Sequence, residues 1–226
     1  MGRSRQVIPQ LGQWQTQVLP KATQKALQYL AGQAWLKQSS WYLAGGTALT
    51  LHFGHRQSVD LDFFTPQKNF LARQLVGHFT DDIWQVDILT DDTVYGKLHG
   101  AKVSFIAYPF FFHQQPYHWV GHVRMLDPKD IAVMKIIAIS QRGRKRDFLD
   151  LYWYVKQQES LTDILLRLPK QYPTVAHDYN HILKSLMYFV DAEEDPMPQL
   201  YFTVSWEEIK KYFKKEVPKI LKSFVF

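Results

Sequence analysis

The sequence predicts an α+β chain, in which a small mixed sheet of about five strands, flanked by helices, precedes a C-terminal helical region. Short apolar runs separated by turn residues fill residues 42–108. From Asp127 onward, apolar residues recur at helical spacing instead. With 226 residues, 46% hydrophobic and 15% aromatic, the chain can bury a sizeable core. We expect two domains, residues 1–126 and 127–226.

Apolar periodicity and turn residues place the elements of the first domain. A packing helix is expected over 21–37, and a second helix begins at Thr47, after the Gly45–Gly46 pair. Residues 69–79 read as a third helix, with Leu71, Leu75 and Val76 facing inward. The expected strands are 42–44, the run carrying Asp60 and Asp62, 84–89, 93–98 and 102–108.

Helical spacing and proline breaks place the elements of the second domain. Asp127 is a plausible N-cap and Pro128 a first-turn residue, so a helix is expected through Gln141. Gly143 ends it, and further helices are expected over 145–157, 161–168, 174–190 and 206–221. The aromatic segment 109–122 lies near the end of the first domain and contains three histidines. We expect it to be a packed loop, because its spacing matches no zinc finger and no cysteine assists.

The stretch YLAGGTALTLHFGHRQSVDLDFF, residues 42–64, carries the candidate chemistry. Side chains two apart in a strand share a face, so Asp60 and Asp62 project together at roughly 6.5 Å between Cα atoms, while Leu61 and Phe63 point into the core. Two such carboxylates repel each other unless a cation lies between them, and oxygen ligands suit Mg²⁺ or Mn²⁺. Gly45 and Gly46 let backbone amides approach an anion beside a helix N-terminus. Metal and phosphates are therefore expected side by side.

This arrangement resembles the nucleotidyltransferase superfamily with the DNA polymerase β fold, whose signature is Gly-Gly-Ser/Thr followed by Asp-x-Asp/Glu. The wording GGTAL, GHR, S-x-DLDFF and RDFLDLYW is similar to the AbiEii/AbiGii toxin family of bacterial toxin–antitoxin and phage-defence systems. The resemblance implies an NTP-dependent enzyme with Asp60 and Asp62 as metal ligands. It also implies a set of nucleotide-binding residues: Gly45, Gly46, Thr47, Arg56, Ser58 and Lys135. Alternatively, Arg56 is an ordinary surface arginine beside a turn.

The expected third carboxylate is missing from the candidate strand AKVSFIAYPF. By resemblance, Ser104 occupies the place where an aspartate is expected. Asp87, in WQVDIL, is another candidate for the third carboxylate. Alternatively, Asp87 is an ordinary aspartate that faces solvent. The departure leaves open whether one metal or two bind.

Lys135 emerges from an apolar helix face, because Ile131, Ala132, Ala138 and Ile139 are its neighbours three and four positions away. It matches a motif lysine of the family and is expected to neutralise phosphate charge. The alternative is a snorkelling stem at the core edge. In RDFLDLYW, Asp147 is favoured for a direct role, since Asp150 can pair with Arg146 at i, i+4 on the surface. The helical domain is expected to complete the active-site cleft.

The amino-acid composition limits the kinds of partner and the location expected for the chain. Net charge +6 and a pI near 9.3 favour RNA or nucleotides, although a merely basic surface gives the same total. The charge gathers at 142–146 and 210–222. Zero cysteines exclude disulfides and fit a reducing cytoplasm. The polar N-terminus and the lack of any apolar run near the ~20 residues that cross a bilayer predict a cytoplasmic protein without membrane contact.

Two functions remain open from the sequence. The first is a Mg²⁺-dependent nucleotidyltransferase toxin that transfers NMP from an NTP to an acceptor, RNA and tRNA 3′ ends in particular, with a cognate antitoxin protein implied by the resemblance. The second is a nucleotide-binding module without turnover that acts through a protein or RNA partner. Ser104 favours the module, whereas the intact Asp60, Asp62 and Lys135 favour the enzyme.

Overall fold

The computed structural model describes residues 13–223, which form two compact units. The first unit holds the chain through Pro109 together with Pro116–Asp127, and the second holds Phe110–Gln115 and the chain from Pro128 onward. Most of the polar N-terminal segment lies outside the described residues. Within residues 13–223, no helix is both long and apolar enough to cross a membrane.

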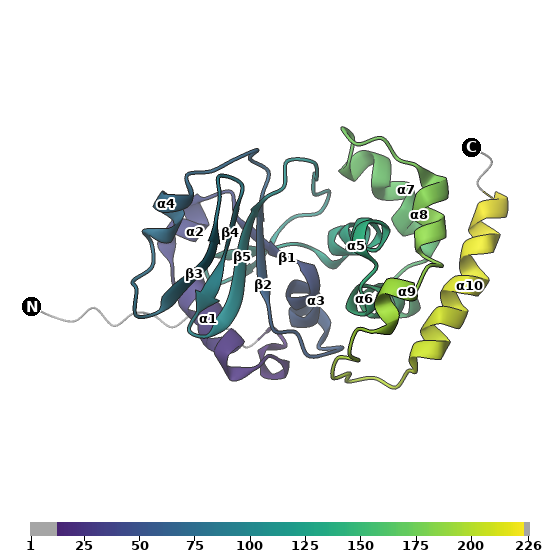
Figure 1. Ribbon diagram of the computed structural model, residues 1–226, viewed down its shortest axis with the longest axis horizontal. Helices are drawn as coiled ribbons and strands as arrows, with labels where there is room; N and C mark the ends of the chain where they lie inside the picture. The colour runs from purple at the N-terminus through teal and green to yellow at the C-terminus, as the bar shows by residue number, and fades with distance from the viewer. Residues whose placement is uncertain (1–12, 224–226) are drawn as a thin grey trace, which may run out of the picture. The chain divides into compact units, whose positions relative to one another are not determined.

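A mixed sheet organises the first unit (Figure 1), and within the described residues it has seven strands in the order β3-β4-β5-β2-β1-β7-β6. The strands are β1 Tyr42–Ala44, β2 Leu61–Thr65, β3 Trp84–Leu89, β4 Thr93–Leu98, β5 Ala101–Ala107, β6 His118–Val120 and β7 Val123–Met125. β1 runs antiparallel to β2 and parallel to β7, and β2 runs parallel to β5. The central strands are thus the pair that carries the candidate motif.

The sequence predicted about five strands, and the two further strands are β6 and β7, which form a hairpin. Both strands fall around the aromatic segment that was expected to be a loop, and each is only three residues long. A three-residue strand is too short for apolar alternation to show in the sequence. Its hairpin turns at Gly121, whose φ of 59° is left-handed, and β7 then pairs with β1.

The helices of the first unit are α1 Lys21–Ala31, α2 Ala34–Gln38, α3 Gly45–Phe53 and α4 Ala72–Val76, preceded by the short 3₁₀ helix η1 Thr16–Val18. The single helix expected over 21–37 is interrupted at Gly32, whose N–H bonds the Tyr29 carbonyl at the end of α1. The helix expected over 69–79 is shorter, and Leu71 is 68% exposed because it precedes the first helical residue in an extended conformation. Figure 1 shows α3 beside β1 and β2, on the side of the sheet away from α4.

The core of the first unit follows the alternation predicted for β2. Leu61 and Phe63 are fully buried, and the ring of Phe63 stacks on Phe105 of β5 at 5.0 Å between centroids. Asp62 and Phe64 are only partly buried. Because the strand turns its apolar side chains to the core, the motif carboxylate is left on the other face.

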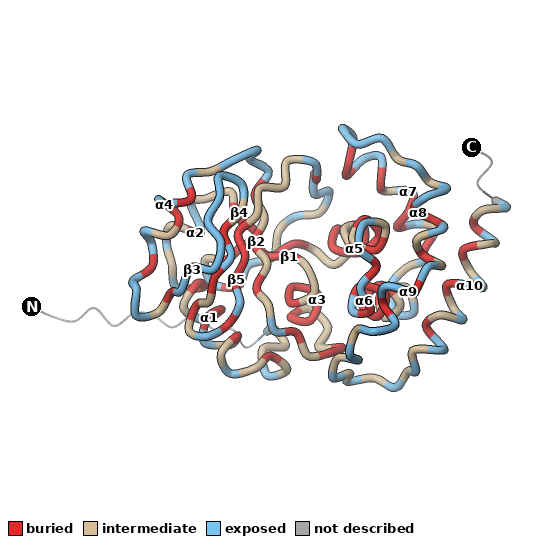
Figure 2. Tube along the Cα trace, viewed as in Figure 1, coloured by how far each residue is buried: buried red, intermediate tan, exposed pale blue. Residues whose placement is uncertain are grey.

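The second unit is helical: α5 Pro128–Arg142, α6 Lys145–Gln157, α7 Leu161–Gln171, α8 Tyr179–Ser185, α9 Val190–Glu193 and α10 Trp206–Ser223. The helix expected over 174–190 is two short helices, α8 and α9, separated by a turn. α5 is buried along most of its length, as Figure 2 shows, and packs against α6, α7 and α8. Phe148 of α6 contacts Phe189, Trp206 and Phe213, which ties α10 to this core.

Candidate active site

The turn from β1 into α3 places backbone N–H groups beside a carboxylate. α3 begins at Gly45 rather than at the predicted Thr47. Gly45 has φ +72°, and a Cβ at this position would lie 3.2 Å from Asp62 Oδ2. A side chain here would therefore be strained and would also crowd the carboxylate. The first N–H groups of a helix have no partner within it, so this turn is a suitable anion site.

Asp62 lies at the centre of the first unit's candidate site. Its Cα partners in the sheet are Ala44 of β1 and Ser104 of β5, so it sits between the strand that ends at the glycine pair and the strand that carries the serine. Asp60 and Asp62 are both partly exposed, while Leu61 between them is fully buried. This alternation places the two carboxylates on the side of the strand away from the core.

Ser104 holds Asp62 in place. The Ser104 hydroxyl donates a hydrogen bond of 2.7 Å to Asp62 Oδ1, and Ser104 is 4% exposed. The bond fixes the carboxylate with its other oxygen near Gly45, and it is strengthened by the charge of the acceptor. The rival carboxylate, Asp87, lies exposed at a bulge in β3, and β4 and β5 separate that edge strand from β2. Asp87 is therefore not a third carboxylate of this site.

Thr47 and Ser58 fix the backbone next to Asp60. The Thr47 hydroxyl lies 2.8 Å from the Ser58 hydroxyl and also hydrogen-bonds the Asp60 carbonyl. Both side chains are buried, at 1% and 7% exposure. Because these hydroxyls are engaged within the protein, the part of Thr47 best suited to an anion is its backbone N–H.

Arg56 is buried at 3% exposure, and its Nη1 donates to the Gln57 carbonyl at 2.8 Å. The alternative of a plain surface arginine is therefore wrong. A buried guanidinium is costly unless hydrogen bonds or anions compensate its charge, which is the property that a phosphate-binding arginine needs.

The donor set around Asp62 fits a magnesium ion. Mg²⁺ is commonly bound through one or two carboxylates together with waters and substrate phosphates. Asp60 and Asp62 supply two carboxylates, and in residues 13–223 no cluster of three or more His, Cys, Asp or Glu side chains could hold a metal ion. The residues are those of a site that a nucleotide's own phosphates would complete.

The second unit carries a buried ion-pair cluster that involves the other predicted residues. Lys135 Nζ of α5 lies 2.7 Å from Asp147 Oδ1 and 2.6 Å from Asp150 Oδ2, both on α6. Lys135 is 5% exposed, Asp147 1% and Asp150 0%. Arg142 Nε, at the end of α5, lies 3.7 Å from Asp147 Oδ2. Lys135 is thus on the apolar face as its neighbours predicted, and the snorkelling alternative is wrong because its ammonium group is itself buried.

Asp150 has a larger part in this cluster than its position in the sequence predicted. It was expected to pair with Arg146 on the surface, yet it is fully buried against Lys135. The signal was present: two aspartates three apart in RDFLDLYW lie on one helix next to a lysine that emerges from an apolar face. Both carboxylates contact the Lys135 ammonium directly, and Arg142 adds a longer contact to Asp147, so the ammonium is strongly held.

Known proteins resemble the chain at the level of sequence and of fold. Residues 29–109 and 80–224 match the model of a family described as "Nucleotidyl transferase AbiEii toxin, Type IV TA system". An uncharacterized protein of Aquifex aeolicus (strain VF5) is 36% identical over 195 residues, which cover 82% of this chain and 90% of that protein.

Two solved structures share the fold. MenT4, a nucleotidyltransferase toxin from Mycobacterium tuberculosis H37Rv, matches with a TM-score of 0.51 at 15% identity and covers 91% of this chain and 87% of its own. JHP933 from Helicobacter pylori matches with a TM-score of 0.50 at 19% identity, over 91% of this chain and 97% of its own. At these identities the likeness is one of fold.

Proposed function

Because the chain belongs to the AbiEii family of nucleotidyltransferase toxins of type IV toxin–antitoxin systems, we propose that it transfers a nucleoside monophosphate from an NTP to RNA in a magnesium-dependent reaction. We propose tRNA 3′ ends as the acceptor and the cytoplasm as the place of action, since NTPs and tRNA are found there. The observation that carries this proposal is Asp62, held by Ser104, facing the glycine turn at the start of α3. The net charge of +6 supports a polyanionic acceptor.

The reaction needs positioning and charge stabilisation more than covalent help from the protein. Asp60 and Asp62 would hold the Mg²⁺, which when bound compensates charge on the phosphates. The N–H groups of Gly45, Gly46 and Thr47 bind phosphate oxygens of the leaving pyrophosphate. The acceptor hydroxyl oxygen forms a bond to the α-phosphorus and releases its proton to water, while the bond from that phosphorus to the bridging oxygen breaks and pyrophosphate leaves with that oxygen.

Lys135 keeps a place in this proposal, with its role refined by the ion pairs. An ammonium group has three N–H donors, and the contacts to Asp147 and Asp150 account for two of them. We propose that the third serves a phosphate oxygen, with the two aspartates as positioning residues. Arg56 adds a phosphate contact, and Ser58 acts through Thr47 and the backbone at Asp60.

The binding-module alternative is set aside. It depended on Ser104, and this serine has a defined place as the hydrogen-bond donor that orients Asp62. Membership of a nucleotidyltransferase family points the same way.

The test is label transfer. The purified chain is incubated with each NTP labelled at the α-phosphate, Mg²⁺ and total tRNA, and RNA-bound label is measured. We expect transfer by the natural chain, a loss of about 100-fold or more in Asp62→Asn, and a loss of less than about 10-fold in Ser104→Ala, which removes one hydrogen bond. NTP binding without transfer by the natural chain, or full transfer by Asp62→Asn, would contradict the proposal.

A further inference from the structure

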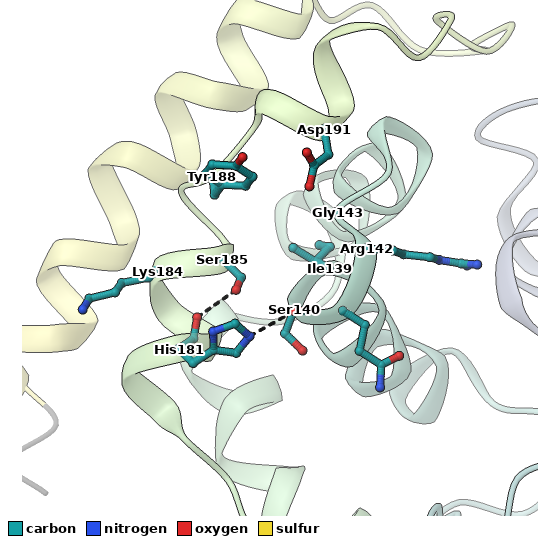
Figure 3. A pocket seen from close by; sticks show the side chains of 10 residues that line it. Ile139, Ser140, Arg142, Gly143, His181, Lys184, Ser185, Tyr188 and Asp191 are labelled. Atoms are coloured by element: carbon teal, nitrogen blue, oxygen red, sulfur yellow. Dashed lines mark hydrogen bonds between the residues drawn. The ribbon is translucent and has the colours of Figure 1, made fainter.

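The second unit contains a pocket that none of the proposed chemistry uses. It lies between the end of α5, α8 and the turn into α9, with a volume of about 360 Å³ (Figure 3). The residues that line it include Ile139, Ser140, His181, Ser185, Tyr188 and Asp191. Figure 3 shows His181 and Ser140 together on one side of the pocket and Tyr188 and Asp191 on the other.

One side of this pocket carries a hydrogen bond between two helices. His181 Nε2 lies 3.1 Å from the Ser140 carbonyl at the end of α5, so an Nε2–H can donate to it. The Ser185 hydroxyl donates to the His181 carbonyl at 2.8 Å within α8. The first bond joins α8 to the end of α5, and the second lies within α8.

The other side offers an aromatic ring and a carboxylate to solvent. Tyr188 is 52% exposed although its neighbour Phe189 is buried at 6%. Asp191 is also exposed. An exposed tyrosine ring can stack on a base, and a carboxylate accepts hydrogen bonds from the amino and imino groups of bases. A volume of this size suits one nucleoside rather than a helix or a strand.

Cations flank the pocket. The Arg142 side chain is 58% exposed, and Figure 3 shows it extending away from the pocket on the side opposite Lys184, which is also exposed. Arg142 and Lys184 both line the pocket. Cations around a single stacking ring favour a nucleic-acid strand over a peptide, because the strand carries a phosphate on either side of each base.

We propose that this pocket binds one unpaired nucleotide of the acceptor RNA, with the base on Tyr188, hydrogen bonds to Asp191 and the flanking phosphates near Lys184 and Arg142. The inference deepens the proposed function and rests on RNA being the acceptor. Bases in a duplex are stacked on each other, so the site selects single-stranded segments or ends.

The test is fluorescence anisotropy with a short fluorescein-labelled single-stranded RNA and the full chain, without NTP or Mg²⁺. Tyr188→Ala is expected to weaken binding about 5- to 140-fold, the range of one base–aromatic stack, and Tyr188→Phe to retain it. Tyr201→Ala is the matched control, because Tyr201 is 47% exposed in the same unit and does not line the pocket. Lys184→Glu is a second test variant, at a solvent-facing position, and is expected to weaken RNA binding most at low salt.

Unchanged binding in both Tyr188→Ala and Lys184→Glu, an equal loss in Tyr201→Ala, or no RNA binding by the natural chain would overturn the inference. Its failure is distinguishable from that of the proposed function, because binding requires no turnover. Tyr188-dependent RNA binding without label transfer contradicts the proposed function alone. Label transfer with an unchanged KM for RNA in Tyr188→Ala contradicts only the inference that the pocket binds the acceptor RNA.

Discussion

At the residue scale, one serine and one glycine, Ser104 and Gly45, determine the position and the accessibility of the Asp62 carboxylate. Ser104 replaces a carboxylate that would repel Asp62 with a hydroxyl that donates to it. Gly45 adopts a left-handed conformation and leaves room for the other carboxylate oxygen. The carboxylate is thereby fixed by one neighbour and kept accessible by the other.

Gly45→Ala tests this arrangement. An alanine at φ +72° is strained by about 1–2 kcal/mol, and its Cβ would press on Asp62 Oδ2 at 3.2 Å. We expect a modest loss of stability in urea unfolding together with a loss of label transfer of at least about 10-fold. Gly100→Ala is the control, since Gly100 also has positive φ but its Cβ would meet nothing within 4 Å. Equal transfer by both variants would mean that the space beside Asp62 is not needed.

Lys135→Met tests the buried cluster. Removing the ammonium takes away a cation that contacts two buried carboxylates, Asp147 and Asp150, which costs about 3–5 kcal/mol of unfolding free energy. Urea unfolding measures this loss, and adding Asp150→Asn to Lys135→Met should recover part of it. Lys170→Met, at an exposed lysine of α7, should change the free energy by less than about 0.5 kcal/mol. An unfolding free energy for Lys135→Met like that of the natural chain would show that the cluster does not stabilise the unit.

At the element scale, the sequence predicted the long periodic elements well and the short ones poorly. β3, β4 and α6 have the predicted bounds, because each is long enough for its apolar period to show. β6 and β7 were missed, since they are short and β7 exists by pairing with β1. β1 is equally short, but the glycine pair that follows it marked its end in the sequence. The pairing of Asp150 with Lys135 was also missed. It depends on how α5 packs on α6, and the sequence does not show which helices pack together.

The end of α3 offers a pH test at this scale. His52 of α3 is hydrogen-bonded to the Leu126 carbonyl at 3.0 Å, and burial lowers the pKa of His52 to about 4, with smaller effects from that bond, His118 and Asp127. The unfolded chain, with an ordinary histidine pKa near 6.5, then binds the proton more readily than the folded chain between pH 6.5 and 4. The folded state therefore loses stability as the pH falls through that window.

From pH 7 to pH 5 this linkage amounts to about 2 kcal/mol. Urea unfolding at both pH values, in the natural chain and in His52→Gln, measures the contribution, because glutamine does not titrate. We expect the pH dependence of the unfolding free energy to shrink by that amount in His52→Gln. A pH dependence that is the same in both chains would mean that His52 is not held neutral by the fold.

At the scale of the whole molecule, the chain belongs to a family of nucleotidyltransferase toxins of type IV toxin–antitoxin systems, and it shares its fold with MenT4. The fold class and the motif residues could be read from the sequence because four blocks stand in the family's order. The β6–β7 hairpin, the buried state of Arg56 and the pocket at Tyr188 could not, since each is a product of tertiary packing.

Growth after induction of the chain without its antitoxin tests the toxin activity in cells. We expect growth arrest by the natural chain and relief by Asp60→Ala, because the proposed metal site loses a ligand. Asp87→Ala is the matched control, the same substitution at an exposed aspartate on the edge strand, and should still arrest growth. Arrest by Asp60→Ala at equal protein levels would place the toxicity outside the proposed site.

The most direct measurement of the central claim is metal binding at the aspartate pair. Mn²⁺ can stand in for Mg²⁺ and is observed by electron paramagnetic resonance, here with a non-hydrolysable NTP analogue present. The natural chain is predicted to bind Mn²⁺ with the analogue, and Asp62→Asn, which keeps the shape but removes the charge, to bind it at least about 10-fold more weakly. Equal Mn²⁺ affinity in the two chains would contradict the account.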